Sequence, residues 1–106
     1  MFKLVKENEA VARRAGADYL IKDYLTKDFN RAVSLVTVTL DGEHTVAGNE
    51  PSDRIYFFTD GNATFNINGV TIHATKNDTL FIEKNTPYHV HGTFTAVLIN
   101  TPAFGV

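Results

Sequence analysis

The stretch Arg54–Gly69 reads RIYFFTDGNATFNING, and it decides the fold. Its first five residues place Ile55 and Phe57 on one face and the other three side chains on the opposite face, which is the period of two of a β-strand. Both faces carry large side chains, so we expect both to be covered. Asp60-Gly61 predicts a tight turn, and Asn68-Gly69 predicts a second turn of the kind that favours hairpins. The stretch therefore predicts consecutive antiparallel strands.

The same pattern continues on either side of this stretch. Val36, Val38 and Leu40 alternate with threonines, as in a strand with one buried face. Turn residues at 76–78 and 85–87 separate further short apolar runs. We count seven or eight strands, which predicts an all-β barrel or sandwich. Residues 8–17 could form a short helix that Gly16 ends, whereas 17–25 could equally be an edge strand.

Length and composition limit the number of domains and the kinds of partner that are expected. The chain has 106 residues, 43% hydrophobic and 21% charged, which fits one globular domain spanning 1–106. We divide it into an N-terminal strand or helix extension (1–31) and a barrel (32–104). The formal net charge is −2, and from Ala32 onward three Lys or Arg face seven Asp or Glu. That acidic balance disfavours nucleic acid and anionic membranes as partners.

Cysteine usage and hydropathy narrow the chemistry and the location further. The chain has no cysteine, so disulfides, thiolate metal ligands and thiol catalysis are excluded. No apolar run approaches the roughly 18 residues of a membrane span, and charges occur within the first six residues. We therefore expect a cytoplasmic protein.

Two motifs carry a resemblance to the cupin superfamily, over roughly residues 33–104. The family's first motif is Gly, five residues, His-x-His, three or four residues, Glu, six residues, Gly; here Gly42 and Gly61 match the glycines, and the three ligand positions hold Gly48, Glu50 and Arg54. The second motif corresponds to residues 77–89, where strict counting puts Tyr88 at the family's histidine. His89 takes that position only if the preceding turn holds one extra residue. The resemblance implies a jelly-roll β-barrel, also called a double-stranded β-helix.

In the cupin family, three imidazoles and one carboxylate hold a metal ion. The substituted ligand positions of this chain decide whether such a metal is expected here. Arg54 stands where the carboxylate belongs, and a guanidinium has no lone pair to offer a cation. We therefore expect no metal or other cofactor. The alternative is a divalent metal ion in a rearranged site, whose ligands would come from His44, Glu50, His89 and His91. The competing interpretation of His44 is a solvated turn residue, and we expect His73 to be structural.

The barrel interior is expected to form a pocket for a small-molecule ligand, an anion being one option because of Arg54. The candidate ligand-binding residues are Arg54, Tyr56, Tyr88, His89 and His91. Tyr88 and His89 are the candidate catalytic residues, as proton-transfer groups of an acid–base enzyme such as an isomerase. A buried Arg54 would need an acidic partner, for which Glu50 and Asp53 are at hand.

Three functions stay open from the sequence. The first is a small-molecule-binding cupin without the usual metal, which includes the acid–base enzyme. The second is a metal-dependent oxygenase or isomerase. The third is a dimeric structural or interaction module, and we expect a homodimer in any case.

Overall fold

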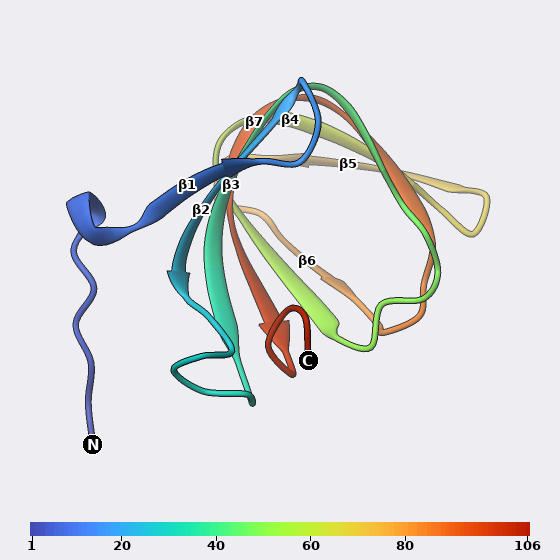
Figure 1. The fold of residues 1–106 in the computed structure, drawn as a ribbon. Helices are drawn as coiled ribbons and strands as arrows, with labels where there is room; N and C mark the ends of the chain where they lie inside the picture. Colours follow the sequence, from blue (N-terminus) through green and yellow to red (C-terminus); the bar gives the residue numbers. More distant parts are fainter.

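A computed structural model describes residues 1–106 as one antiparallel sheet of seven strands (Figure 1). The elements are a short 3-10 turn η1 (Glu7–Glu9) and the strands β1 (Val11–Arg14), β2 (Tyr19–Leu25), β3 (Ser34–Val46), β4 (Asp53–Ile67), β5 (Val70–Thr75), β6 (Thr79–Ile82) and β7 (Tyr88–Thr101). Their order in the sheet is β1-β2-β3-β7-β4-β5, and β6 also pairs with β4. The all-β barrel predicted from the sequence is confirmed.

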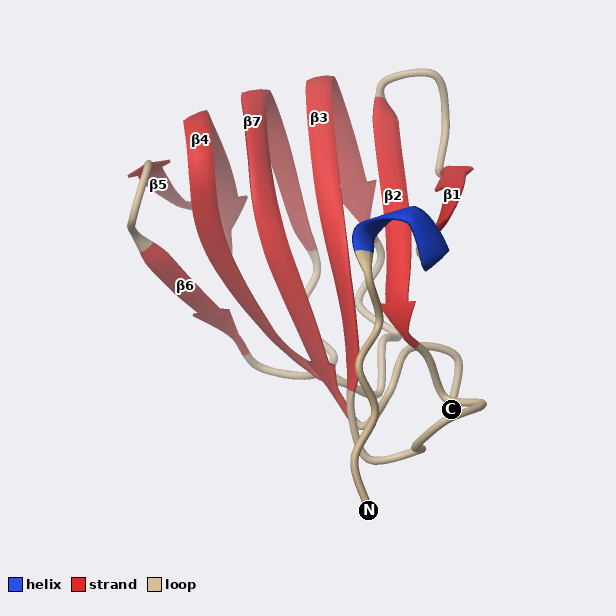
Figure 2. Cartoon of the chain, turned by 90° about the vertical axis from the view of Figure 1, so that its left-hand side faces the viewer, coloured by secondary structure: helices blue, strands red, loops and turns tan.

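The three longest strands bend near their middle, so that the sheet folds over on itself (Figure 2). At the bend, Gly61 and Gly92 have φ angles of 83° and 136°. A Cβ atom on Gly61 would overlap the carbonyl oxygen of Thr93, and one on Gly92 would overlap that of Asn62. Only glycine lets the neighbouring backbones approach this closely.

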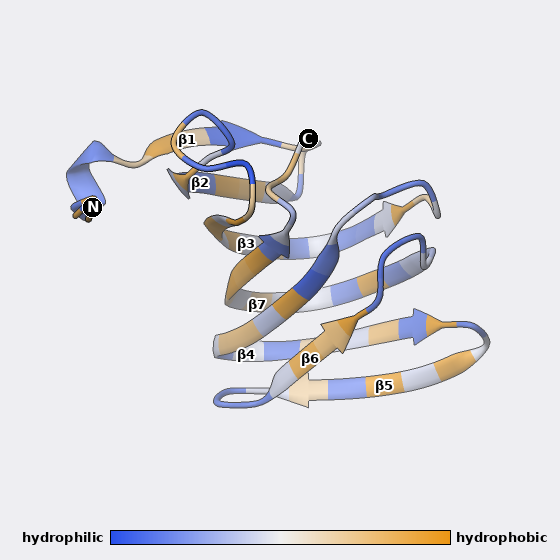
Figure 3. Cartoon of the chain, turned by 90° about the horizontal axis from the view of Figure 1, so that it is seen from below, coloured by the Kyte–Doolittle hydropathy of each residue, from blue (hydrophilic) through white to orange (hydrophobic).

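The bend divides the sheet into two facing layers. β2 pairs with the first half of β3, and β6 pairs with the first half of β4. β5 pairs with the second half of β4, while β7 joins β3 and β4 along its whole length. Hydrophobic and hydrophilic residues alternate along these strands (Figure 3). One face of each layer therefore lies inside the barrel, as the period of two predicted.

The core fills the part of the barrel next to the bend. Val38, Leu40, Phe58 and Phe65 are fully buried there. The Phe58 ring lies 5.9 Å from that of Phe65 and 5.5 Å from that of Phe94, measured between centroids and close to edge-on. Such edge-to-face contacts are favoured by the aromatic quadrupole. This end of the barrel is closed by packed side chains.

The turn predicted at Asp60-Gly61 is wrong, because β4 continues through it. The register of β4 against β7 shifts between Phe58 and Asp60, which is a β-bulge. A bulge adds one residue to the strand. The side chains that face inward are therefore at even-numbered positions before it, as at Phe58, and at odd-numbered positions after it, as at Ala63 and Phe65. The second turn is confirmed: Asn68 and Gly69 have φ angles of 51° and 79° and connect β4 to β5.

Three further expectations are corrected. Residues 8–17 form no α-helix; after η1 they form β1, because pairing with β2 overrides the Ala- and Arg-rich composition. The strand expected at 17–25 exists as β2, but it is paired on both sides and is not an edge. Ile55 and Phe57 are 37% and 44% exposed, so the outer face of β4 is not covered.

No helix of this fold is long and apolar enough to cross a membrane.

Candidate functional site

A row of polar side chains crosses the inner face of the sheet away from the bend. Ser34 on β3 pairs in register with Asn100 on β7, and Asn100 pairs in register with Arg54 on β4. Their exposures are 4%, 3% and 7%, so all three are buried. The next row toward the bend holds Val36 and Leu98, which are apolar. Tyr56 on β4 also belongs to that row, and it contributes a buried hydroxyl.

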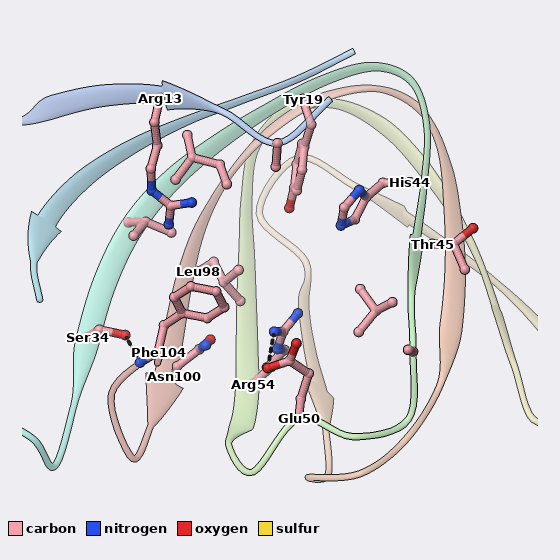
Figure 4. Close-up of a pocket in the computed structure, with 15 residues that line it drawn as sticks. Arg13, Tyr19, Ser34, His44, Thr45, Glu50, Arg54, Leu98, Asn100 and Phe104 are labelled. Carbon is pink, nitrogen blue, oxygen red and sulfur yellow. Dashed lines mark hydrogen bonds and ion pairs between the residues drawn. The ribbon is translucent and has the colours of Figure 1, made fainter. Parts of the chain in front are cut away.

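The open end of the barrel, away from the bend, contains a cavity of about 260 Å³. Side chains from several strands and from the chain's C-terminal segment point into it (Figure 4). The residues of most chemical interest in its wall are Arg13, Tyr19, His44, Glu50, Arg54 and Asn100. The volume lies just below the roughly 300–1,000 Å³ of pockets for drug-sized ligands. A monosaccharide or a nucleoside is of suitable size.

Arg54 is held in place by two direct partners, Tyr88 and Glu50. Its Nη1 donates to the hydroxyl of Tyr88 at 2.8 Å, and that hydroxyl lies 2.6 Å from the hydroxyl of Tyr56. Its Nη2 lies 3.3 Å from Oε2 of Glu50, so the acidic partner expected from the sequence is present. Burial acts to lower the pKa of Arg54, but the Tyr88 and Tyr56 hydroxyls and Glu50 outweigh it and raise the pKa. The guanidinium therefore stays charged.

His44 reaches the cavity from the second half of β3. Its imidazole packs on the ring of Tyr19, with 4.4 Å between the centroids, and both point into the cavity (Figure 4). Burial, followed by the charges of Arg54 and His89, lowers the pKa of His44 below its ordinary 6.5. At neutral pH the imidazole is therefore uncharged and able to accept a proton. The interpretation of His44 as a solvated turn residue is wrong.

The three inner tyrosines are neutral hydrogen-bonding groups. Burial is the main cause that raises the pKa values of Tyr19, Tyr56 and Tyr88 far above those of exposed tyrosines. Tyr19 lines the cavity, whereas Tyr56 and Tyr88 lie behind Arg54 and do not. Of the five expected ligand-binding residues, only Arg54 is therefore part of the cavity wall.

His89 and His91 do not reach the cavity. Tyr88 is 4% exposed and faces inward, so strict counting along the second motif gives the correct register. His89 alternates to the outer face, where its Nδ1 lies 2.9 Å from the Thr45 hydroxyl. His91 is exposed beside it, at 6.2 Å between ring centroids. The structure thus separates Tyr88 from His89, the two expected catalytic residues.

The alternative metal ligands are not brought together. His44 and Glu50 line the cavity, while His89 and His91 lie outside it. The structure contains no group of three or more His, Asp or Glu side chains that could hold a metal ion. Arg54, a cation, lies at one end of the inner polar row and lines the cavity, where it would repel a metal. The donor set does not fit a metal of the usual cupin kind.

Sequence reasoning missed several side chains of the cavity wall, among them Tyr19, Asn100 and Phe104. Tyr19 belongs to the segment whose structure was ambiguous, and only its alternation with Ile21 could have indicated an inward position. Asn100 ends the last apolar run and was counted as part of it. Phe104 lies in the C-terminal segment, which no pattern marks; its backbone N–H donates to the Ser34 hydroxyl at 2.9 Å. His73, expected to be structural, is exposed and bonded to Thr64.

Solved structures with the same arrangement include several cupins. Pac13, described as a unique nucleoside dehydratase, aligns over 99% of this chain and 86% of its own, with a TM-score of 0.83 and 21% identity. Variants of Streptomyces Pac13 with a tyrosine-to-phenylalanine or a histidine-to-glutamine change have been solved with uridine, at TM-scores of 0.82 to 0.83. No protein-family model and no curated protein matches the chain.

Two further neighbours have different names and the same fold. An RmlC-like cupin from Shewanella frigidimarina aligns over 99% of this chain and 95% of its own, with a TM-score of 0.83 and 14% identity. KdgF from Halomonas sp. aligns over 99% and 97%, with a TM-score of 0.83 and 12% identity. Identities this low establish the fold and leave function to be argued from the site. This chain therefore has the cupin fold, a jelly-roll barrel of the kind that its glycine spacing predicted.

Proposed function

We propose that the cavity binds a small, uncharged, hydroxylated molecule and removes water from it by acid–base chemistry. The observation that carries the proposal is the pairing of an uncharged His44 with a charged Arg54 in one cavity wall. A base and a fixed hydrogen-bond donor are the two groups needed to take a proton from carbon next to a carbonyl. Isomerisation begins with the same proton transfer.

The ion pairs of the cavity favour an uncharged ligand over the anion considered from the sequence. Arg54 is paired with Glu50, and Arg13 binds Asp23 through two nitrogens, at 2.6 and 3.2 Å. Each guanidinium in the wall thus already has a carboxylate partner. An anionic ligand would have to displace one of these carboxylates, at a desolvation cost that an uncharged ligand avoids.

The proposed reaction is an elimination in which the imidazole moves the proton. His44 removes a proton from the carbon beside the carbonyl, and the electrons of that C–H bond form a C=C bond. The C–O bond at the next carbon breaks, and the departing hydroxide takes the proton that His44 now carries and leaves as water, which returns the imidazole to its uncharged form. Arg54 donates hydrogen bonds to the carbonyl oxygen as it gains negative charge, and Tyr19 donates to the departing oxygen.

The comparison with Pac13 supports this class of substrate. That protein is described as a nucleoside dehydratase, and its uridine-bound variants alter tyrosine or histidine. This cavity also presents a tyrosine and a histidine, and its volume suits a nucleoside. We therefore choose uridine as the first ligand to test and nucleoside- and sugar-derived β-hydroxy carbonyl compounds as the first substrates.

The test is a turnover assay on a panel of such compounds in D₂O. Mass spectrometry measures loss of water, and NMR measures deuterium at the carbon beside the carbonyl. His44→Gln should lower kcat/KM by roughly 100- to 10,000-fold, the usual contribution of a general base. Because the pKa of His44 is lowered, wild-type activity should be full at neutral pH and should fall only as the pH drops below about 6.5.

His73→Gln is the matched control, since His73 is exposed on β5 and far from the proposed chemistry. It should leave kcat/KM and the pH profile unchanged. Absence of both water loss and deuterium exchange across the panel would refute the proposal. So would equal activity of the two histidine variants.

The outer face of the sheet favours self-association as a second property. Leu35, Ile99, Ile55 and Phe81 form one row in register across β3, β7, β4 and β6, and Val97 and Phe57 pair beside it. Phe57 and Phe81 are 44% and 58% exposed. All six side chains are uncharged, so a second copy related by a two-fold axis could cover them without burying a charge.

Light scattering after gel filtration tests this homodimer. Wild type should have twice the monomer mass, and the double variant Phe57→Ser/Phe81→Ser should be a monomer. Val70→Ser is the control, because Val70 is 57% exposed but lies outside this row. A wild type that stays monomeric at high protein concentration would exclude the dimer while leaving the proposed chemistry untouched.

A further inference from the structure

Asn100 lines the cavity, and its side-chain amide oxygen has no hydrogen-bond partner within the protein. It is 3% exposed, and its Oδ1 is sealed from solvent without a hydrogen-bond partner. A buried polar group without a hydrogen-bond partner lowers the stability of the protein. We therefore expect Asn100 to have such a partner when the protein is functioning. The terminal torsion of asparagine is soft, so either amide atom can turn toward the cavity.

The neighbours of Asn100 are donors. In register on one side, the Ser34 hydroxyl oxygen accepts from the Phe104 N–H, so its own proton remains available to the cavity. On the other side, Arg54 has a buried Nε with no partner. Facing strands hold such side chains about 4.5–5.5 Å apart at Cβ. A ligand edge at Asn100 thus meets an amide that both donates and accepts, flanked by two groups that each have a hydrogen to donate.

Phe104 adds a flat wall next to this row. Its ring lies under the Arg13 guanidinium, 5.4 Å from ring centroid to Cζ, and borders the same cavity as Asn100 and Ser34 (Figure 4). An aromatic ring beside a set of in-plane hydrogen-bonding groups suits a planar heterocycle better than a puckered sugar. His44 and Tyr19 are left for the remainder of the ligand.

We propose that Asn100, Ser34 and Arg54 form a subsite that recognises the imide edge of a planar ring, in which an N–H lies between two carbonyl oxygens. The N–H of the ring donates to Asn100 Oδ1, and its two carbonyls accept from the flanking donors. This deepens the proposed function, on which it rests for taking the cavity to be the substrate site. It assigns the ring to one end of the cavity and the reacting carbons to the His44 end. Arg54 has five N–H groups, so its Nε donates to the ring while an Nη hydrogen that Tyr88 and Glu50 leave unused donates to the reacting carbonyl.

Calorimetric titration with uridine and with 3-methyluridine tests the subsite. The added methyl group removes the imide N–H while keeping the ring and the ribose. Wild type should bind uridine at least about tenfold more tightly than 3-methyluridine, because the methylated ring leaves Asn100 unpaired. Asn100→Leu should weaken uridine binding by a similar factor and should abolish the difference between the two ligands.

Asn62→Leu is the matched control, since Asn62 is exposed on the outer side of β4. It should keep the full preference for uridine. Replacing an unpaired buried amide by an apolar side chain of similar size should leave the melting temperature of Asn100→Leu unchanged or raised, so loss of fold would not explain lost binding. Asn100→Asp keeps the shape and the acceptor oxygen and loses only the donor, so it should still bind uridine in preference to 3-methyluridine.

Equal binding of the two ligands, no binding of uridine at millimolar concentration, or a preference that survives in Asn100→Leu would each overturn the subsite. These outcomes are distinct from failure of the proposed function. Binding that depends on Asn100 without any water loss would support the subsite and refute the dehydration. Water loss with no dependence on the ring or on Asn100 would support the dehydration and refute the subsite.

Discussion

The two ends of the barrel are built from the same three strands and differ in what their inner faces carry. Next to the bend, β4 presents Phe58 and Phe65, whose rings contact each other and carry no polar atom. At the open end, the same strand presents Arg54, whose neighbours include an unpaired amide on Asn100. The closed end has no buried side-chain polar atom without a hydrogen-bond partner, whereas the open end has such atoms on Arg54 and Asn100.

The difference indicates where stability and function lie in this molecule. Apolar side chains at the closed end gain by being removed from water and need no partner. Buried polar groups at the open end cost stability unless something binds them, and proteins retain such groups mainly at functional sites. Damage at the closed end should therefore lower stability, whereas changes at the open end should alter binding or pH dependence more than stability.

The largest expected effect of this kind is that of Phe65→Ala. Removing a fully buried ring leaves a cavity among Tyr56, Phe58 and Tyr88, which all contact it. The free energy of unfolding should fall by about 3–5 kcal/mol, as for other buried phenylalanines. Chemical denaturation monitored by circular dichroism measures it.

Phe104→Ala is the matching change at the open end. Phe104 is 45% exposed, so its loss should cost about 1 kcal/mol or less in the free energy of unfolding. A similar loss of stability from both variants would show that the open end contributes to the core as much as the closed end does, and the contrast between them would fail.

The closed end was largely predictable from the sequence, and its one error is instructive. Alternation alone identifies Val36, Val38 and Leu40 as inward, and the structure confirms them. At Asp60-Gly61, however, a turn and a bulge look alike in sequence, since both favour glycine with a positive φ. Which one forms depends on whether a partner strand continues past the site, and β7 does so. That pairing is non-local and leaves no local signal.

The open end was less predictable, because its residues come together only through the bend. Arg54 and its partner Glu50 are four residues apart, and the sequence suggested that pair correctly. Tyr19, His44 and Asn100 come from three distant parts of the chain, and no spacing relates them. The choice between Tyr88 and His89 depended on one residue of register, which turn length alone did not determine.

A stability effect smaller than that of Phe65→Ala is expected from Tyr88→Phe, which tests how the open end holds Arg54. The change removes a hydroxyl that bonds both Arg54 Nη1 and the Tyr56 hydroxyl inside the barrel. Leaving those groups unpaired should lower the free energy of unfolding by about 1–3 kcal/mol, without creating a cavity. Tyr24→Phe, on the half-buried strand β2, is the control and should have little effect.

The pH dependence of that variant separates a hydrogen-bonding role from simple packing. Burial raises the pKa of Tyr88, so the folded protein keeps its hydroxyl protonated at a pH where the unfolded chain loses that proton. Stability from such a group is complete below the unfolded pKa of about 10 and is lost as the pH rises above it. Wild type should therefore lose stability above pH 10 more steeply than Tyr88→Phe. Equal slopes would mean that the Tyr88 hydroxyl is not buried with Arg54, and that the guanidinium at the open end is fixed by Glu50 alone.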